Sequence, residues 1–165
     1  MPAINGGVCV VNDKPVDKVY SNGVQVYGRN LIQMANTTAG YVDKSNGTII
    51  PADSDLERVT DFIEVEPNQT YWLQDEINLV SGQYLWVGVG VYDDNKNFIN
   101  RPTLLGETAK GNITDFKKMA MVIPSNAKYV RISFSTYGRN AKVKLEKSAT
   151  AIPWTPAPED VGVYV

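Results

Sequence analysis

The chain has 165 residues, a formal net charge of −2, 43% hydrophobic residues and 21% charged residues, an ordinary composition for a globular domain. The slightly negative charge and the scattered basic residues argue against a nucleic-acid partner. No apolar run approaches the roughly 18 residues that a membrane-spanning helix requires, so no membrane insertion is expected.

Histidine is absent and cysteine occurs once. The lack of histidine excludes Ser-His-Asp and Cys-His nucleophile activation and most zinc sites. Cys9 cannot form a disulfide within the chain, and its position between Val8 and Val10 predicts a small buried hydrophobic side chain.

The first 28 residues predict a β-hairpin leader. Two alternating segments, Val16–Tyr20 and Val24–Tyr27, flank an Asn22-Gly23 pair, which is a strong hairpin-turn signal. Because a hairpin of this size cannot hold a core alone, we expect it to add strands to the main domain or to pair with other subunits of an assembly.

Short alternating segments separated by turn residues follow through the rest of the chain. They are Phe62–Val65, Tyr71–Ile77, Tyr84–Tyr92, Phe98–Ile99, Met119–Ile123, Tyr129–Ser135 and Ala141–Glu146. This spacing predicts an all-β fold, an antiparallel β-sandwich. Only Ile113–Lys118 favours a helical turn. In the proline-rich tail, Trp154 is expected to fold back over an edge of the core, with Pro153 and Pro156 fixing its approach.

Alternation also assigns the faces of the predicted strands. We expect one aliphatic face to form the core, with these side chains buried together: Val87, Val89, Val91, Val130, Ile132 and Phe134. On the opposite face Trp86 lies beside Gly88 and Gly90, which lack side chains. The sequence therefore predicts a trough with an aromatic wall.

If these strands share a sheet, one outer face gathers two tryptophans, an arginine and a serine around the glycines. Indole and phenol rings stack on the apolar faces of sugar rings, and planar polar groups bind sugar hydroxyls. The candidate carbohydrate-binding residues are Trp72, Tyr84, Trp86, Arg131, Ser133 and Tyr137. Alternatively, Trp86 and Tyr92 pack beneath a loop or a second layer, and Arg131 is a surface ion-pair partner.

Two polar clusters are weaker candidates. Asp93, Asn95 and Asn97 match the first ligands of a calcium loop, but the sixth position is not glycine and Leu104 replaces the bidentate glutamate. We therefore predict a hairpin turn there, and no cofactor or metal. Asp53, Asp55 and Glu57 form a loop cluster without a recognisable acid–base pair, which predicts no enzymatic activity.

Four segments, in this order, carry a resemblance to a known family: GYVDKSNGTIIPADSDLERVTDFIEVEPNQTYWL, VGVGVYDDNKNFI, IPSNAKYVRISFST and KVKLEKSATAIPWTPAPED. Over roughly residues 29–160 the chain resembles the jelly-roll carbohydrate-binding modules of tail, baseplate and receptor-binding proteins of siphophages that infect Gram-positive bacteria. Members of this family typically end in KLEKG, whereas in this chain Ser148 follows Lys147 directly.

The resemblance implies a jelly-roll sandwich at residues 29–150, between a leader at 1–28 and a proline-rich tail at 151–165. It also implies a non-catalytic module that attaches a phage to host cell-wall polysaccharide. The implied location is the virion, after assembly in the bacterial cytoplasm, and the implied partners are other tail or baseplate proteins or further copies of the chain. Two alternatives stay open: a structural adaptor that binds no sugar, and a glycan-cleaving enzyme with two carboxylates.

Overall fold

The computed structural model describes residues 3–5, 8–52, 56–78, 80, 82–83, 86–102, 105–110, 114–138 and 141–161. Strands make up 49% of the structure, and the described part contains no α-helix, which confirms the predicted all-β fold. Its helical segments are two short 3-10 turns, η1 (Met34–Asn36) and η2 (Pro158–Val161), neither of which is long or apolar enough to cross a membrane.

One sheet of the sandwich has four antiparallel strands in the order β14-β15-β11-β17. Their bounds are Leu105–Lys110 (β14), Thr114–Val122 (β15), Thr70–Asn78 (β11) and Lys142–Lys147 (β17). The helical turn expected at Ile113–Lys118 is wrong from Thr114 onward, because this stretch pairs continuously with β11, from Asn78 opposite Thr114 to Thr70 opposite Val122. A long antiparallel ladder outweighs a weak local preference.

The other sheet has six strands, in the order β13-β12-β16-β9-β6, with β10 also paired to β16. Their bounds are Thr37–Ala39 (β6), Glu57–Thr60 (β9), Ile63–Glu64 (β10), Val87–Tyr92 (β12), Phe98–Asn100 (β13) and Tyr129–Ser135 (β16). Strand β16 is central: it pairs with β9 and then β10 along one edge, and with β12 along the other.

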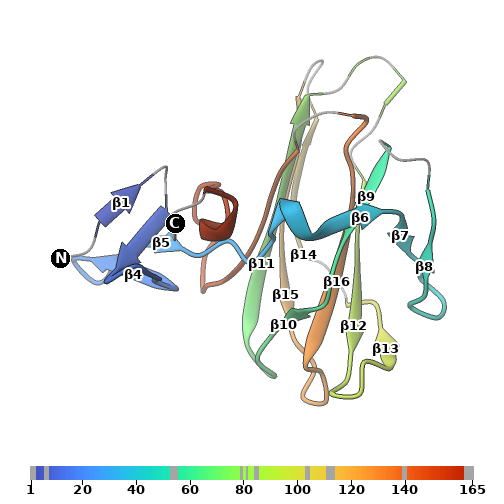
Figure 1. The fold of residues 1–165 in the computed structure, drawn as a ribbon, viewed down its shortest axis with the longest axis horizontal. Coiled ribbons are helices and arrows are strands. Elements are labelled where there is room, and N and C mark those ends of the chain that lie inside the picture. Colours follow the sequence, from blue (N-terminus) through green and yellow to red (C-terminus); the bar gives the residue numbers. More distant parts are fainter. Residues whose placement is uncertain are drawn as a thin grey trace.

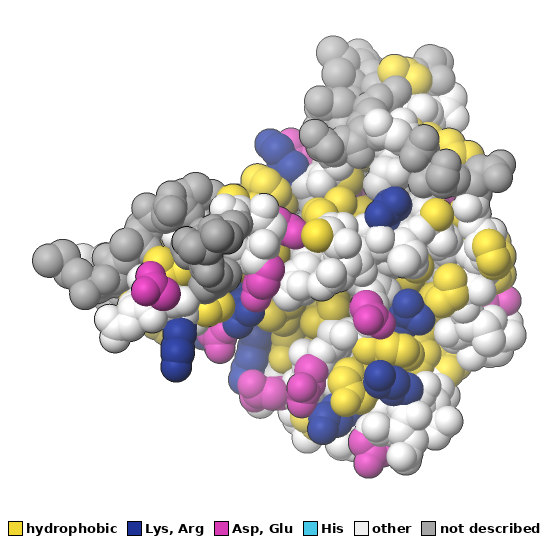
Figure 2. Space-filling model, viewed as in Figure 1, with side chains coloured by type: hydrophobic (Ala, Val, Ile, Leu, Met, Phe, Trp, Pro, Cys, Tyr) yellow, Lys and Arg dark blue, Asp and Glu magenta, His cyan; other side chains and the backbone are white. Residues whose placement is uncertain are grey.

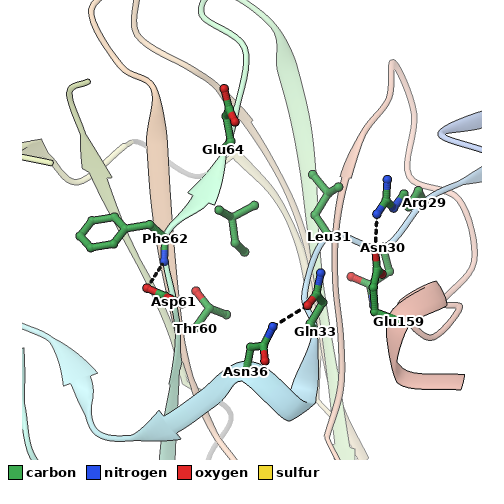
Figure 3. Close-up of a pocket in the computed structure, with 11 residues that line it drawn as sticks. Arg29, Asn30, Leu31, Gln33, Asn36, Thr60, Asp61, Phe62, Glu64 and Glu159 are labelled. Atoms are coloured by element: carbon green, nitrogen blue, oxygen red, sulfur yellow. Dashed lines mark hydrogen bonds and ion pairs between the residues drawn. The ribbon is translucent and has the colours of Figure 1, made fainter. Parts of the chain in front are cut away.

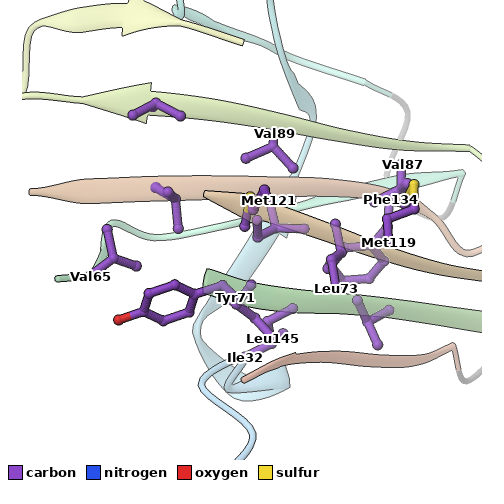
Figure 4. Close-up of a cluster of buried hydrophobic side chains, with 14 of the residues drawn as sticks. Ile32, Val65, Tyr71, Leu73, Val87, Val89, Met119, Met121, Phe134 and Leu145 are labelled. Carbon is purple, nitrogen blue, oxygen red and sulfur yellow. The ribbon is translucent and has the colours of Figure 1, made fainter. Parts of the chain in front are cut away.

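The hydrophobic core fills the space between the two sheets. All six side chains that the alternation assigned to the core are buried in one cluster, together with side chains of β11, β15 and β17. In Figure 4, Leu73 and Leu145 of the four-stranded sheet point toward the same interior as Val89 and Phe134. The period-2 prediction of the buried face is therefore confirmed.

Five strands at the N-terminus form two small sheets beside the sandwich (Figure 1). They are β1 (Ala3–Asn5), β2 (Val8–Val11), β3 (Lys14–Pro15), β4 (Lys18–Ser21) and β5 (Val24–Gly28). Asn22 and Gly23 have φ of 48° and 76°, the left-handed geometry of a tight hairpin turn, as predicted. Cys9 is buried, also as predicted. The proposed boundary at residue 28 stays a prediction.

The C-terminal strap, residues 148–161, runs back along the outside of the four-stranded sheet. Asn30 links it to β17, since the Asn30 amide donates to the carbonyl oxygens of Val143 (2.9 Å) and Thr155 (3.0 Å). Glu159 forms an ion pair with Arg29. Trp154 folds back onto β17, the outermost strand of this sheet, and its Nε1 donates to the Val143 oxygen (3.3 Å). Its side chain stays partly exposed, so it does not cover the core as expected.

Beneath the strap lies a buried ion pair on the outer face of β17. Lys144 Nζ is 3.2 Å from Glu146 Oε2, and neither side chain is exposed. The strap supplies a backbone hydrogen-bond partner to each side chain. Lys144 donates to the Pro153 oxygen (3.0 Å), and Glu146 Oε1 accepts from Ile152 N (2.8 Å). Burial lowers the pKa of Lys144 and raises the pKa of Glu146, while their mutual attraction opposes both shifts.

This geometry predicts strong coupling between the two charges. Either Lys144→Met or Glu146→Gln alone should cost about 3–5 kcal/mol in the free energy of unfolding, because each leaves a buried group without its charged partner. The double variant should be closer to the parent than either single variant. Urea denaturation of the four proteins measures this coupling.

The exposed pair Glu64–Lys128 (3.7 Å) provides a matched control, in which Glu64→Gln should change stability by no more than about 1 kcal/mol. Additive losses in the Lys144/Glu146 double variant would contradict the coupling.

Candidate functional site

A third layer covers part of the six-stranded sheet: the hairpin of β7 (Tyr41–Val42) and β8 (Ile49–Ile50). Backbone and side-chain hydrogen bonds pin this hairpin onto β16 and β12. Val42 N donates to Ser133 Oγ (2.9 Å), and the Tyr92 hydroxyl donates to the Gly47 oxygen (2.7 Å). The hairpin is therefore held at both ends by the outer face of the sheet.

Glycine is required at the tip of this hairpin. Gly47 has φ of +74°, and a Cβ there would overlap the ring of Phe98. Around it, Gly47 N donates to the Asp43 oxygen (2.9 Å) and Asp43 N donates to the Thr48 oxygen (2.8 Å). These bonds close the turn and fix where Tyr41 emerges from it.

The predicted glycine trough is partly filled by neighbouring aromatic rings. A Cβ at Gly88 would lie 3.3 Å from the Trp86 indole, and a Cβ at Gly90 would lie 2.8 Å from the Tyr92 hydroxyl. The glycines therefore admit two rings close to the sheet, and the open space that the sequence predicted is smaller. What stays open is a pocket at the Trp86 end of β12.

We call this the Trp86 pocket; its volume is about 340 Å³. It lies between the β7–β8 hairpin, the start of β12 and the segment after β13, and is lined by Tyr41, Val42, Asp43, Lys44, Ile50, Trp86, Gly88, Val89 and Arg101. Tyr41 and Trp86 meet edge to face, with ring centroids 5.9 Å apart at 84°. Two half-buried aromatic rings at right angles thus form one wall.

Charged groups of both signs surround these rings. Hydrogen bonds from the Ser45 hydroxyl (2.5 Å) and Ser45 N (2.7 Å) lower the pKa of Asp43, so this carboxylate is an ionised acceptor at neutral pH. Lys44 and Arg101 are exposed donors. Asp43 is the one carboxylate among the lining residues that the structure describes, so this lining contains no pair of carboxylates.

The four residues expected to share one face do not lie together. Trp72 belongs to β11 in the four-stranded sheet, opposite Glu146 of β17, and so lies on the far side of the sandwich from Trp86. The expected grouping is therefore wrong for Trp72. Strand alternation defines the inner and outer faces of a strand but does not say which sheet it joins.

The arrangement also corrects the expected places of Ser133 and Arg131. Ser133 is fully buried beneath the β7–β8 hairpin, and its hydroxyl accepts the hydrogen bond from Val42 N. Arg131 pairs with Gly90, four residues along β12 from Trp86, and its Nε donates to the Thr60 oxygen (3.0 Å). At about 3.3 Å per residue, the two positions are roughly 13 Å apart along the strand.

Two further candidates lie elsewhere. Tyr84 is outside the described residues. Tyr137 is half-buried after β16, with φ of 50°, and packs against the hydrophobic core. Of the six residues proposed from sequence, Trp86 lines the pocket and the other described residues do not.

Three contributors to the pocket are absent from the six candidates proposed from sequence: Tyr41, Asp43 and Arg101, the last of which begins a loop that the sequence offers only as an alternative site. A usable signal was present for the first two, because the Asn46-Gly47 pair within YVDKSNGTII is the same type of turn signal as Asn22-Gly23. Arg101 follows β13 and carries no local pattern. Its place beside Trp86 is a product of tertiary structure.

A second pocket, of about 290 Å³, lies where η1 approaches β10 (Figure 3). Its lining is polar, and several groups already have partners: Arg29 pairs with Glu159, and the Asn36 amide donates to Gln33 Oε1 (2.5 Å). In Figure 3 the Phe62 ring points away from these groups. This pocket lies between the strap and the six-stranded sheet. Its described lining has no pair of aromatic rings like that of the Trp86 pocket.

Asp93 closes the turn between β12 and β13. Its Oδ1 accepts hydrogen bonds from the backbone of Asn95 (2.9 Å) and Asn97 (2.8 Å), and these contacts lower its pKa. The geometry is that of the predicted hairpin turn. Among the described residues no group of three or more Cys, Asp or Glu side chains is placed to hold a metal ion. Asp53 and Asp55 of the predicted carboxylate cluster lie outside those residues.

Comparison with known proteins found a phage relative. The chain is 30% identical over 142 residues to a tail fiber protein of Enterococcus phage phiEF24C. The match covers 85% of this chain but 7% of the relative's length. No family model matches the chain, and no solved structure matches it. The similarity supports a phage tail-related protein.

The serine contacts generate a prediction. Ser133→Ala should destabilise the protein by about 1–3 kcal/mol, because it leaves the buried Val42 N–H without its acceptor. Denaturant unfolding measures the loss, and the exposed Ser125→Ala is the matched control. Parental stability in Ser133→Ala would show that the hydroxyl does not hold the hairpin.

Proposed function

We propose that this chain is a non-catalytic carbohydrate-binding module of a phage tail fibre, which attaches the particle to host cell-wall saccharides through the Trp86 pocket. The observation that carries this proposal is the right-angled pair of Tyr41 and Trp86 beside an ionised carboxylate and two exposed cations. Sugars present both apolar C–H faces and hydroxyl edges, and this pocket offers partners for both.

The similarity to a tail fiber protein supports the biological setting. Weak binding by each copy is sufficient where several copies of a module are displayed together. A single site with millimolar to micromolar affinity, about −4 to −8 kcal/mol, gains avidity when neighbouring copies engage the same wall. Localisation in the virion and contacts with other tail proteins belong to the same proposal.

One observation favours a second candidate function, that of a structural adaptor. Three apolar side chains of the β4–β5 hairpin are strongly exposed: Tyr20 (58%), Val24 (65%) and Val26 (51%). Exposed apolar side chains on a small two-stranded sheet suit contact with another protein of the tail. The two functions involve different parts of the chain, so they can be tested separately.

The test of the binding proposal is Trp86→Ala. We expect it to abolish retention on purified cell walls while the melting temperature stays within a few degrees of the parent, because the indole is only half-buried. The first probe is cell walls of enterococci, because the relative belongs to an Enterococcus phage. Fluorescence-labelled protein and a wall pull-down provide the measurement.

Trp154→Ala is the matched control, since its indole is also partly exposed (38%) but lies outside the pocket. It should retain wall binding. If Trp86→Ala is stable and still binds, the sugar site is elsewhere. If no wall preparation retains the parent protein, the binding proposal fails and the adaptor function is favoured.

A further inference from the structure

A cluster of cations and aromatic rings occupies the outer face of the six-stranded sheet, beyond the Trp86 pocket. We call it the Phe62 surface and define it as Phe62, Lys96, Tyr129 and Arg131. The Phe62 ring lies edge to face with Tyr129, with centroids 5.9 Å apart. Figure 2 shows hydrophobic side chains bordered by Lys and Arg side chains, and also by Asp and Glu side chains, over the lower part of this sheet.

Two cations contact the same ring. The Arg131 guanidinium carbon is 4.7 Å from the Phe62 centroid and Lys96 Nζ is 4.8 Å from it; Lys96 is also 5.7 Å from the Tyr129 centroid. Exposed cation–π contacts stabilise by only about 0.5–1 kcal/mol, and they leave the positive charge in place. The surface therefore combines flat apolar rings with two positive groups.

Carboxylates close to this surface keep their negative charge, but the partners that the structure gives them are groups other than Lys96 and Arg131. Glu64 pairs with Lys128 at 3.7 Å, and Asp61 Oδ1 accepts the Phe62 backbone N–H at 2.7 Å. Asp93 accepts hydrogen bonds from its own turn on both oxygens. Among the described residues, no carboxylate oxygen lies within 4.0 Å of the charged nitrogens of Lys96 or Arg131.

The turn after β12 places Lys96 over the rings. Lys96 has φ of 63°, a left-handed conformation that is uncommon for a lysine, and its N–H donates to the Asp93 oxygen (3.1 Å). A turn closed by Asp93 thus fixes the backbone from which the ammonium reaches Phe62. The fold therefore fixes the backbone of Lys96, and the rings of Phe62 and Tyr129 contact its ammonium.

We propose that the Phe62 surface binds the anionic groups of the same wall polymer whose saccharide enters the Trp86 pocket. This inference rests on the proposed function and specifies its ligand class: a saccharide chain bearing phosphodiester or carboxylate groups. Arg131 lies roughly 13 Å along the strands from Trp86, on the same outer face. A polymer can span that distance with successive units, whereas a single sugar cannot.

The test uses the full chain and two treatments of one wall polysaccharide. Hydrofluoric acid removes phosphodiester-linked groups, and carbodiimide amidation neutralises carboxylates, so the two treatments separate the two possible anions. Lys96→Asn removes one charge and suits the left-handed backbone. Lys14→Asn, at an exposed position on β3, has the same effect on net charge and is the matched control.

We expect Lys96→Asn to bind the untreated polymer about threefold to tenfold more weakly than the parent, with a smaller loss at high ionic strength. Lys14→Asn should bind like the parent. One of the two chemical treatments should weaken the parent to the level of Lys96→Asn and abolish the difference between them. Thermal unfolding confirms that both variants fold.

Outcomes for this proposal and for the proposed function differ. The anion site is overturned if Lys96→Asn and Lys14→Asn bind equally well, or if the polymer keeps its affinity for the parent protein after each of the two treatments. In that case the proposed function still stands if Trp86→Ala loses binding. A selective loss in Lys96→Asn with full binding by Trp86→Ala supports the anion site and rejects the Trp86 pocket. Absence of binding by the parent protein rejects both.

Discussion

The burial of alternate side chains between two antiparallel sheets is the constraint on which the rest of the structure depends. Val89 and Ile132 from one sheet and Leu73 and Leu145 from the other share one interior. With a period of two, this burial commits every intervening residue to an outer face. The residues on each outer face must then be either covered by another segment or exposed to solvent, and the two sheets differ in this respect.

On the four-stranded sheet the outer face is covered by the C-terminal strap. Outer residues Gln74, Lys144 and Glu146 are polar yet buried, because the C-terminal strap lies over them and supplies backbone partners from Ile152 and Pro153. Gly28 contributes by leaving room for the Glu146 carboxylate, which a Cβ would overlap. The KVKLEK segment and the proline-rich tail that follows it are thus two halves of one structural contact.

On the six-stranded sheet the cover is incomplete, and this leaves the Trp86 pocket and the Phe62 surface uncovered. Ser133 and Tyr92 hold the β7–β8 hairpin over the middle of the face. The Trp86 pocket opens at one end, and the Phe62 surface is exposed farther along. Both contain aromatic rings in mutual edge-to-face contact, Tyr41 with Trp86 and Phe62 with Tyr129. Under the proposed function, such packed rings would lose little conformational entropy on binding a ligand.

The sequence by itself determined the strand class, the buried face of β12 and β16, and the Asn22-Gly23 turn, because each depends on local periodicity or backbone conformation. Alternation also placed Trp86 on the face opposite the core, where it lines a pocket. Tertiary structure alone decided that Trp72 lies in the other sheet, that Ser133 bonds to β7, and that Tyr41 and Arg101 meet at Trp86. Those placements depend on which strands pair and on how a distant hairpin folds over a sheet, and alternation along one strand carries no information about either.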